Sequence, residues 1–203
     1  MQKDTFYQIR RELHQHPELS GHEARTARFV EDKLQAFHPT KVIRHVGGHG
    51  LLVEYFFSED GPTVLFRADM DAVAVQEPDD IPHHSQTPGV AHKCGHDGHT
   101  AIGLGIAAEL MKRKGELKGK IKLFFQPAEE TFYGAQSIVD KGHLDDVMNF
   151  IAVHIALSAE NKPLPSHTVA CGCRDFLSDR QLDVYLEGKA AHPCGASQEG
   201  KNA

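Results

Sequence analysis

The order of apolar and polar positions along the chain predicts helices that alternate with strands. Helical spacing of apolar residues predicts four helices. Three are expected at 4–16, 98–114 and 134–141, and the remaining one should begin at Ser20 or Gly21 and end before Pro39. Short apolar or β-branched runs predict strands at 41–46, 50–57, 63–66, 120–125, 150–155, 167–170 and 181–186. This alternation indicates a layered α/β domain.

Two segments carry further expectations. The apolar strand at 150–155, with His154 near its carboxyl end, suits a central position in a covered sheet. The segment 76–95 is rich in Pro and Gly and predicts a long loop. Loops of that length in a compact domain are usually functional or disordered, so this loop is a place to look for chemistry.

Composition narrows the class of protein. Lys and Arg number 22 and Asp and Glu 28, so the net charge of −6 argues against a general binder of nucleic acid or anionic membranes. No apolar run approaches the roughly 18 residues of a membrane span, and the N-terminus has no apolar signal core, so the cytoplasm is the expected location. Four cysteines do not indicate a disulfide framework, whereas 15 histidines favour metal or acid–base chemistry.

Acidic and imidazole side chains follow three of the predicted strands. Asp69 and Asp71 follow one strand. Glu129 and Glu130 follow a second, and His154 lies near the end of a third. Ligands of open α/β sheets collect outside the carboxyl ends of the strands, so these groups are expected to converge on one edge.

The hexapeptide from Cys94 to His99 is the sharpest local signal. Cys94 and His96 are separated by one residue and cannot share a helical face, but a loop can turn both toward one point. Thiolate and imidazole are good zinc ligands, and Gly95 and Gly98 would let the backbone fold tightly around an ion. The alternative is a His-rich loop with a buried cysteine. The nearby His83, His84 and His92, like His99, are expected to be peripheral, and Cys171 and Cys173 to form a plain strand turn.

The acidic pairs each leave two interpretations open. One of Glu129 and Glu130 can hold a metal while the other acts as a general base, and spacing does not say which. The alternative is an acidic helix N-terminus. Asp69 and Asp71 could accept hydrogen bonds from a metal-bound histidine, or could cap a strand or pair with Arg67.

Several motifs together resemble one family. In chain order they are His14-Gln-His-Pro-Glu-Leu19, Arg67-Ala-Asp-Met-Asp71, Cys94-Gly-His-Asp-Gly-His99, Phe125-Gln-Pro-Ala-Glu-Glu130, Gly134-Ala135, Val153-His154, Gly188-Lys-Ala-Ala-His-Pro193 and Gly200-Lys-Asn-Ala203. The chain resembles the metal-dependent amidohydrolase branch of the aminoacylase/carboxypeptidase metallopeptidases, which includes N-acyl-amino-acid, hippurate and auxin-conjugate hydrolases.

The resemblance implies a fold and a set of roles. The fold is a layered α/β/α catalytic domain like that of the zinc exopeptidases, here residues 1–179, with the start of an inserted α/β lid or dimerisation domain at 180–203. The implied site holds two divalent metal ions, zinc or manganese. The residues that match the family's roles are Cys94, His96, Glu130 and His154 as metal ligands, Glu129 as general base, Asp71 as the residue that orients a ligand, and His192 of the lid as a substrate-holding residue.

The resemblance also implies a function. A metal-activated water would cleave the amide bond of a small N-acyl amino acid or peptide, and the whole protein would form a homodimer or a higher oligomer with no nucleic-acid or membrane partner. Family members are about twice this long, and their last metal ligand would lie beyond residue 203. The segment after Asp71 departs from the usual pattern, so the acyl preference stays open. Two alternatives are a non-catalytic metal-binding or dimerisation module of the same fold and a structural zinc protein.

Overall fold

The computed structural model describes residues 3–156, 158–159, 162–165, 168–169, 185 and 187–189. The chain divides into two units, Met1–Asn161 and Lys162–Ala203. The main sheet, its helices and the candidate site belong to the first unit. The predicted strands at 167–170 and 181–186, the two cysteines of the predicted strand turn and the proposed domain boundary lie wholly or largely outside the described residues.

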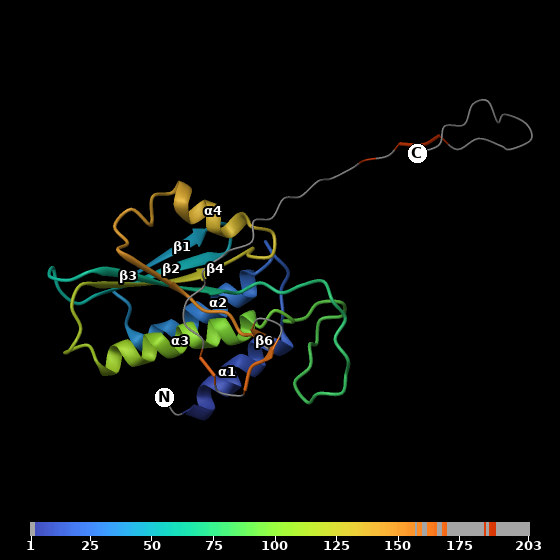
Figure 1. Ribbon diagram of the computed structural model, residues 1–203, viewed down its shortest axis with the longest axis horizontal. Helices are drawn as coiled ribbons and strands as arrows, with labels where there is room; N and C mark the ends of the chain where they lie inside the picture. The colour runs from blue at the N-terminus through green and yellow to red at the C-terminus, as the bar shows by residue number, and fades with distance from the viewer. Residues whose placement is uncertain are drawn as a thin grey trace, which may run out of the picture. The chain divides into compact units, whose positions relative to one another are not determined.

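A five-stranded mixed sheet forms the centre of the first unit (Figure 1). Its strands are β1 (Lys41–Val46), β2 (Gly50–Phe56), β3 (Thr63–Asp69), β4 (Lys120–Gln126) and β5 (Asn149–Ala152). They lie in the order β1-β2-β4-β3-β5. The pairs β1–β2 and β2–β4 are antiparallel, whereas β3 is parallel to both β4 and β5. Two short strands follow, β6 (Ser158–Ala159) and β7 (Lys162–Pro163).

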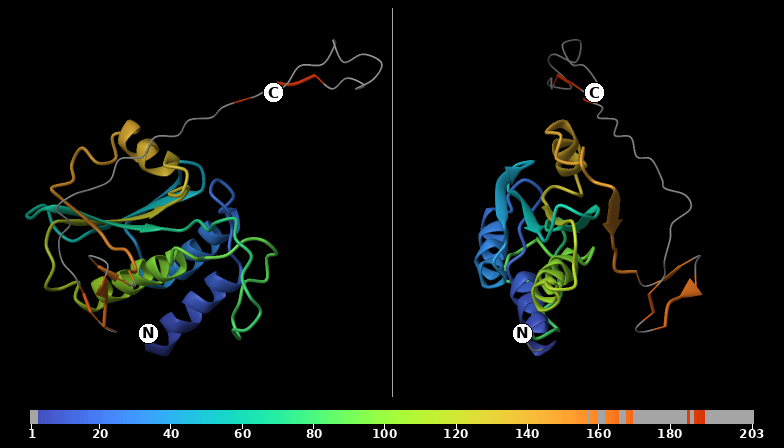
Figure 2. Two further views of the ribbon diagram at one scale, coloured as in Figure 1. Left: turned by 45° about the vertical axis from the view of Figure 1, so that its right-hand side comes forward. Right: turned by 90° about the vertical axis from the view of Figure 1, so that its left-hand side faces the viewer.

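Helices cover both faces of this sheet (Figures 1 and 2). They are α1 (Lys3–Gln15), α2 (Ala24–Leu34) with the short 3₁₀ turn η1 (Gln35–Phe37), α3 (His96–Lys112) and α4 (Tyr133–Asp140). The first three helices lie on one face and α4 lies on the other. The predicted layered α/β class is confirmed. No helix of the described chain is long and apolar enough to cross a membrane.

Alternation of side chains along the strands builds a separate core on each face. On β4, Leu123 and Phe125 face α1–α3, and the intervening Phe124 faces α4. On β3, Phe66 faces α1–α3 and the adjacent Leu65 faces α4. All of these side chains except Phe66, which is 8% exposed, are essentially excluded from solvent. The two cores therefore hold β3 and β4 rigidly, and the site lies at the carboxyl ends of these strands.

The predicted position of β5 is wrong. Among the described strands it pairs with β3 alone, at the edge of the sheet, and Phe150 and Ile151 are 53% and 48% exposed. The strand also ends earlier than predicted, at Ala152. Past this point the chain turns toward α3, where the Ile155 side chain packs against Gly95 and Gly98. The apolar pattern of residues 150–155 indicated that their side chains pack against other parts of the protein, but it did not identify which element they contact.

Candidate metal centre

The parallel strands β3, β4 and β5 deliver their acidic and imidazole residues to the same edge of the sheet. Asp69 is the last residue of β3, and the Glu129–Glu130 pair follows β4. His154 was expected within a strand, but it follows β5. The predicted convergence of these groups is therefore present in the structure.

His96 stands at the centre of this group. It is fully buried, and its Nδ1–H donates to the backbone carbonyl of Asp71 at 2.8 Å. The other ring nitrogen, Nε2, is also buried and has no hydrogen-bond partner among the described residues. It lies 3.7 Å from a carboxylate oxygen of each of three residues, Asp69, Glu129 and Glu130. A buried acceptor surrounded by carboxylates is an arrangement that a cation would stabilise.

The local backbone explains how Cys94 and His96 meet. The helix α3 begins at His96, so this residue lies on the first helical turn and not on a loop as expected. Gly95 precedes it with a φ of +88°, a left-handed conformation that favours glycine. This reversal places the Cys94 sulfur, a ring nitrogen of His96 and a carboxylate oxygen of Glu130 within 4.8 Å of one another.

Two further groups of possible ligands include the same histidine. Asp69, His96 and Glu129 form one group, and His96, His99 and His154 form the other, again with ligand atoms within 4.8 Å of one another. All four residues expected to bind metal therefore belong to groups that share His96. The expected lid residue His192 lies outside the described residues.

Asp71 contacts both His96 and the segment that follows β4. Its Oδ2 accepts hydrogen bonds from the Ser20 hydroxyl at 2.6 Å and from the Glu130 amide at 3.0 Å. Its Oδ1 lies 3.3 Å from His96 Nδ1. Burial alone would raise the pKa of Asp71, but the nearby His96 ring, the Ser20 hydroxyl and the Glu130 amide lower it overall. Asp71 therefore stays ionised and links the ends of β3 and β4 to α3.

A strained turn precedes the two adjacent carboxylates. Ala128 has a φ of +49°, unusual for a residue other than glycine, and its amide donates to the buried Glu23 carboxylate at 2.8 Å. This turn directs Glu129 toward Asp69 and Glu130 toward Cys94, with both near His96. The alternative of an acidic helix N-terminus is wrong, because α4 begins only at Tyr133.

The electrostatics of the site favour a bound cation. Burial raises the pKa of Glu129, and Asp69 raises it further, while Arg67, 3.6 Å away, and His96 oppose this shift. Burial and then the carboxylates of Glu130, Glu129 and Asp71 raise the pKa of Cys94 to about 12. A thiol in such surroundings stays protonated unless a metal ion compensates its charge.

The residues present fit a metal ion. The buried atoms without a hydrogen-bond partner among the described residues include Asp71 Oδ1, His96 Nε2 and Glu130 Oε1, all in this cluster. The donor set combines one thiol, imidazole nitrogens and carboxylates, which suits zinc and accepts manganese.

His154 presents one ring nitrogen to the cluster. Its Nδ1–H donates to the carbonyl of Ile155 at 2.7 Å, which leaves Nε2 as the acceptor that could bind a metal. The ring centroid lies 6.0 Å from that of His96 and 4.7 Å from that of His99. His154 is exposed, so it does not belong to the hydrophobic core.

Sequence reasoning undervalued Asp69 and His99, both fully buried here. The Nδ1 of His99 lies 2.5 Å from Asp69 Oδ1, and its Nε2 lies 2.8 Å from the Ile155 amide. The available signal was the spacing of three residues between His96 and His99, which places both side chains on one face once the segment is a helix.

A second buried polar network anchors the 76–95 loop. His14 on α1 contacts Asp97 through Nδ1 at 2.8 Å and Glu77 through Nε2 at 3.1 Å. Both ring nitrogens face carboxylates, and chiefly the hydrogen bond to Asp97 raises the pKa of His14. Glu77 also accepts hydrogen bonds from Lys93 and from the Ser85 amide. The network ties the loop that carries Cys94 to α1 and α3.

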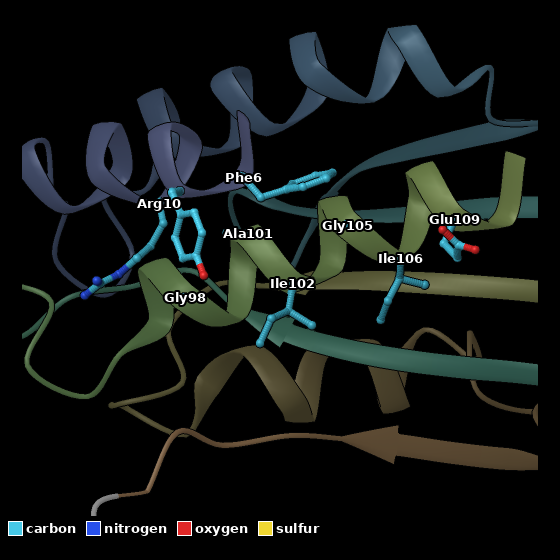
Figure 3. Close-up of a pocket in the computed structure, with 9 residues that line it drawn as sticks. Phe6, Arg10, Gly98, Ala101, Ile102, Gly105, Ile106 and Glu109 are labelled. Carbon is cyan, nitrogen blue, oxygen red and sulfur yellow. The ribbon is translucent and has the colours of Figure 1, made fainter. Parts of the chain in front are cut away.

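A groove of about 510 Å³ lies between α1 and α3, apart from the ligand cluster (Figure 3). Phe6 and Arg10 line it from α1, and Gly98, Ile102 and Gly105 are among the residues that line it from α3. The possible metal ligands do not line this groove, so its apolar surface does not define the chemistry of the site.

Comparisons with known proteins agree with this geometry. Residues 65–186 match the profile of peptidase family M20/M25/M40. The chain is 42% identical over 164 residues to indole-3-acetyl-aspartic acid hydrolase of Enterobacter agglomerans, covering 77% of this chain and 36% of that protein. It is 41% identical over 147 residues to N-acyl-L-amino acid amidohydrolase of Geobacillus stearothermophilus, and this match covers 72% of this chain and 40% of that protein. The chain thus spans well under half the length of these relatives.

A solved structure shows the same fold. The YXEP protein of Bacillus subtilis, described as a dinuclear metal binding peptidase from the M20 family, superposes with a TM-score of 0.72 at 36% identity. The superposition covers 76% of this chain and 43% of that one.

Proposed function

The chain belongs to peptidase family M20/M25/M40, and we propose that it carries the metal centre of a hydrolase that cleaves the amide bond of N-acyl amino acids or small peptides. The observation that carries this proposal is the buried, unpartnered Nε2 of His96, with three carboxylates at 3.7 Å and the thiol of Cys94 beside it. The three carboxylates could form ion pairs with this nitrogen only if the ring were protonated, whereas divalent cations would bind the neutral ring and the carboxylates together.

The proposed ligands are Cys94, His96, Glu130 and His154, and the proposed ions are two divalent cations, zinc or manganese. The dinuclear site of the B. subtilis structure supports this number. Divalent ions held by these residues would supply a water acidic enough to lose a proton near neutral pH. The backbone carbonyl of Asp71 accepts a hydrogen bond from His96 Nδ1–H, and the Asp71 carboxylate lies 3.3 Å from the same nitrogen. These contacts would keep the His96 ring oriented so that Nε2 faces the ions.

Glu129 is the proposed general base. Its raised pKa brings a carboxylate closer to the range in which it can accept a proton from water and then return that proton to the departing amine. Arg67, 3.6 Å from Oε1, would keep the carboxylate directed at the site. His192, in the proposed lid that starts near residue 180, would help to hold the reacting carbonyl.

The names of the relatives support the proposed substrate class. Both indole-3-acetyl-aspartic acid and an N-acyl-L-amino acid are amides formed on the amino group of an amino acid. We extend this class to the present chain without choosing the acyl group. A cytoplasmic homodimer or higher oligomer without nucleic-acid or membrane partners remains part of the proposal.

The proposal is tested by metal analysis and by turnover. The proposed full-length protein is loaded with Zn²⁺ or Mn²⁺, and its metal content is measured by elemental analysis. Hydrolysis of acetyl-amino acids, benzoyl-amino acids and dipeptides is followed by amine release. Glu129→Gln should keep the metal and lose about 10²–10⁴-fold in kcat. Metal binding without turnover of any substrate would favour the non-catalytic module. A single tight ion whose chelation unfolds the chain would favour a structural zinc protein.

A further inference from the structure

Both ring nitrogens of His99 are used by groups other than the proposed ions. The Ile155 amide donates to Nε2 at 2.8 Å, so Nε2 is an acceptor and Nδ1 carries the proton. Nδ1 then donates to Asp69 Oδ1 at 2.5 Å. Arg67 holds the other oxygen of that carboxylate. His99 therefore has a fixed tautomer and a fixed ring plane, although its position beside His96 and His154 makes it a possible metal ligand by proximity.

The backbone of Ile155 connects His99 to His154. Its amide donates to His99, and its carbonyl accepts the Nδ1–H of His154 at 2.7 Å. The His99 ring also contacts the His154 ring edge to face, with centroids 4.7 Å apart. His154 is exposed and follows an edge strand, so the sheet alone holds it weakly. The Ile155 backbone and the His99 ring are the contacts that connect it to α3.

Two glycines of α3 provide space for the Ile155 side chain. A Cβ at Gly95 would lie 3.2 Å from Ile155 Cδ1 and 3.3 Å from Ile155 Cβ, and a Cβ at Gly98 would lie 2.5 Å from Cδ1. The φ of Gly98 is not positive, so its backbone does not require glycine. Glycine within a helix is about 1 kcal/mol less favourable than alanine. Contact with Ile155 gives a physical reason for glycine at this position.

We propose that His99 is a positioning residue that holds His154 toward the metal centre through the backbone of Ile155, which Gly95 and Gly98 allow to pack against α3. The inference rests on the proposed function, because the purpose of a fixed His154 ring is to bind a metal ion. The competing view, that His99 is itself a ligand, would require it to release the Ile155 amide.

The first test uses His99→Asn in the full chain. The asparagine amide can still donate to Asp69 but offers Ile155 no acceptor at the position of Nε2. His92→Asn is the matched control, since His92 is also buried and neither of its ring nitrogens has a hydrogen-bond partner among the described residues. Exchange of the Ile155 amide is measured by NMR in metal-free protein, and Zn²⁺ affinity by competition with a chelator.

We expect His99→Asn to accelerate exchange of the Ile155 amide by about tenfold or more and to weaken Zn²⁺ binding by about 10–100-fold, the usual effect of removing a group that orients a ligand. His92→Asn should change neither quantity. An Ile155 amide that exchanges equally slowly in wild type and His99→Asn would overturn the proposal, as would unchanged Zn²⁺ affinity.

A second set of variants leaves His99 intact and covers the case in which His99→Asn does not fold. Gly98→Ala should displace Ile155, weaken Zn²⁺ binding and leave the free energy of unfolding equal or higher. Adding Ile155→Val removes Cδ1 and should restore affinity. Gly105→Ala is the control on the same helix, because a Cβ there meets nothing closer than 3.9 Å. Equal Zn²⁺ affinity of Gly98→Ala and Gly105→Ala would overturn the proposal and favour His99 as a ligand.

The two hypotheses can fail separately. A wild-type chain that binds no Zn²⁺ would refute the proposed metal centre. The exchange rate of the Ile155 amide would still show whether His99 holds this segment. A wild-type chain that binds Zn²⁺, with variants that bind it equally well, would refute the positioning role and leave the proposed function intact.

Discussion

Replacing Glu77 by Gln tests whether the buried network holds the loop that carries Cys94. Glu77 is only 4% exposed and accepts hydrogen bonds from His14 Nε2 at 3.1 Å, from the Ser85 amide at 2.7 Å and from Lys93. Glutamine has nearly the same shape but carries no charge. The substitution therefore removes the ionic part of these contacts and leaves the packing in place.

The expected magnitude follows from the pKa of Glu77. Burial alone would raise this pKa, but Lys93, the Ser85 amide and His14 lower it from 4.5 to about 2. At about 1.4 kcal/mol per pKa unit, the ionised carboxylate contributes on the order of 3 kcal/mol to the free energy of unfolding. Lys93 is 41% exposed, so solvent screens part of this contribution, and we expect Glu77→Gln to lose about 2 kcal/mol.

The loss should depend on pH in a defined direction. The folded pKa of Glu77 is lowered, so its contribution is present above the unfolded value of about 4.5 and is lost as pH falls toward 2. The folded pKa of His14 is raised, so its contribution is complete below about 6.5 and is lost as pH rises through the folded value. The difference between wild type and Glu77→Gln should therefore be largest between about pH 4.5 and 6.5.

Urea unfolding followed by circular dichroism at pH 3, 5.5 and 9 measures this difference. The matched control is Glu109→Gln, which removes an exposed carboxylate paired with Lys112 at 3.0 Å and should change the free energy of unfolding by less than about 1 kcal/mol at every pH. A Glu77→Gln effect that is equal at all three pH values, or no larger than that of the control, would refute the assignment of an ionic anchor to Glu77.

Three further predictions concern the metal centre and the core. Cys94→Ser should weaken metal binding by at least about tenfold. In the cobalt-loaded protein it should also abolish the thiolate-to-Co²⁺ charge-transfer absorption band. Persistence of that band would exclude Cys94 as a ligand. Metal content after dialysis should fall between pH 7.5 and 5, because the Cys94 thiol, whose pKa is about 12, must lose its proton to bind and because acid protonates His96 Nε2, whose pKa the nearby carboxylates raise. Constant metal content would contradict this. Gly103→Ala should lower the free energy of unfolding by about 1–2 kcal/mol in urea titrations, because its Cβ would lie 2.8 Å from the Phe125 ring, whereas Gly105→Ala on the same helix should be neutral or stabilising.

The sequence alone determined most elements of the described chain and the edge of the sheet at which the possible metal ligands gather. The strand predicted at 41–46 and the helix predicted at 134–141 were found at or within one residue of their expected bounds, because apolar periodicity and glycine or proline at the ends are local properties. The convergence of the acidic and imidazole residues at the ends of β3, β4 and β5 was also accessible, because parallel strands bring such residues to a common edge. The ligand set Cys94, His96, Glu130 and His154 came from the family resemblance of the motifs.

Local patterns predicted several boundaries less well, two of them at the candidate site. Asp69 belongs to β3 and His96 begins α3, although both had been placed outside regular structure. Polar residues interrupt the apolar pattern at these ends, because they serve the site and not the core. Periodicity alone therefore ends the strand too early and begins the helix too late.

Only the tertiary structure decided which side chains act on one another at the site. It showed that Ala128 takes a left-handed turn against Glu23, that His99 uses both nitrogens on Asp69 and Ile155, and that β5 lies at an edge. Each of these facts depends on contacts between residues far apart in the chain. A sequence pattern indicates whether each residue prefers water or the protein interior, which is a local preference. The partner of a buried charge or hydrogen-bonding group depends on how the helices pack on the sheet, which the pattern does not contain.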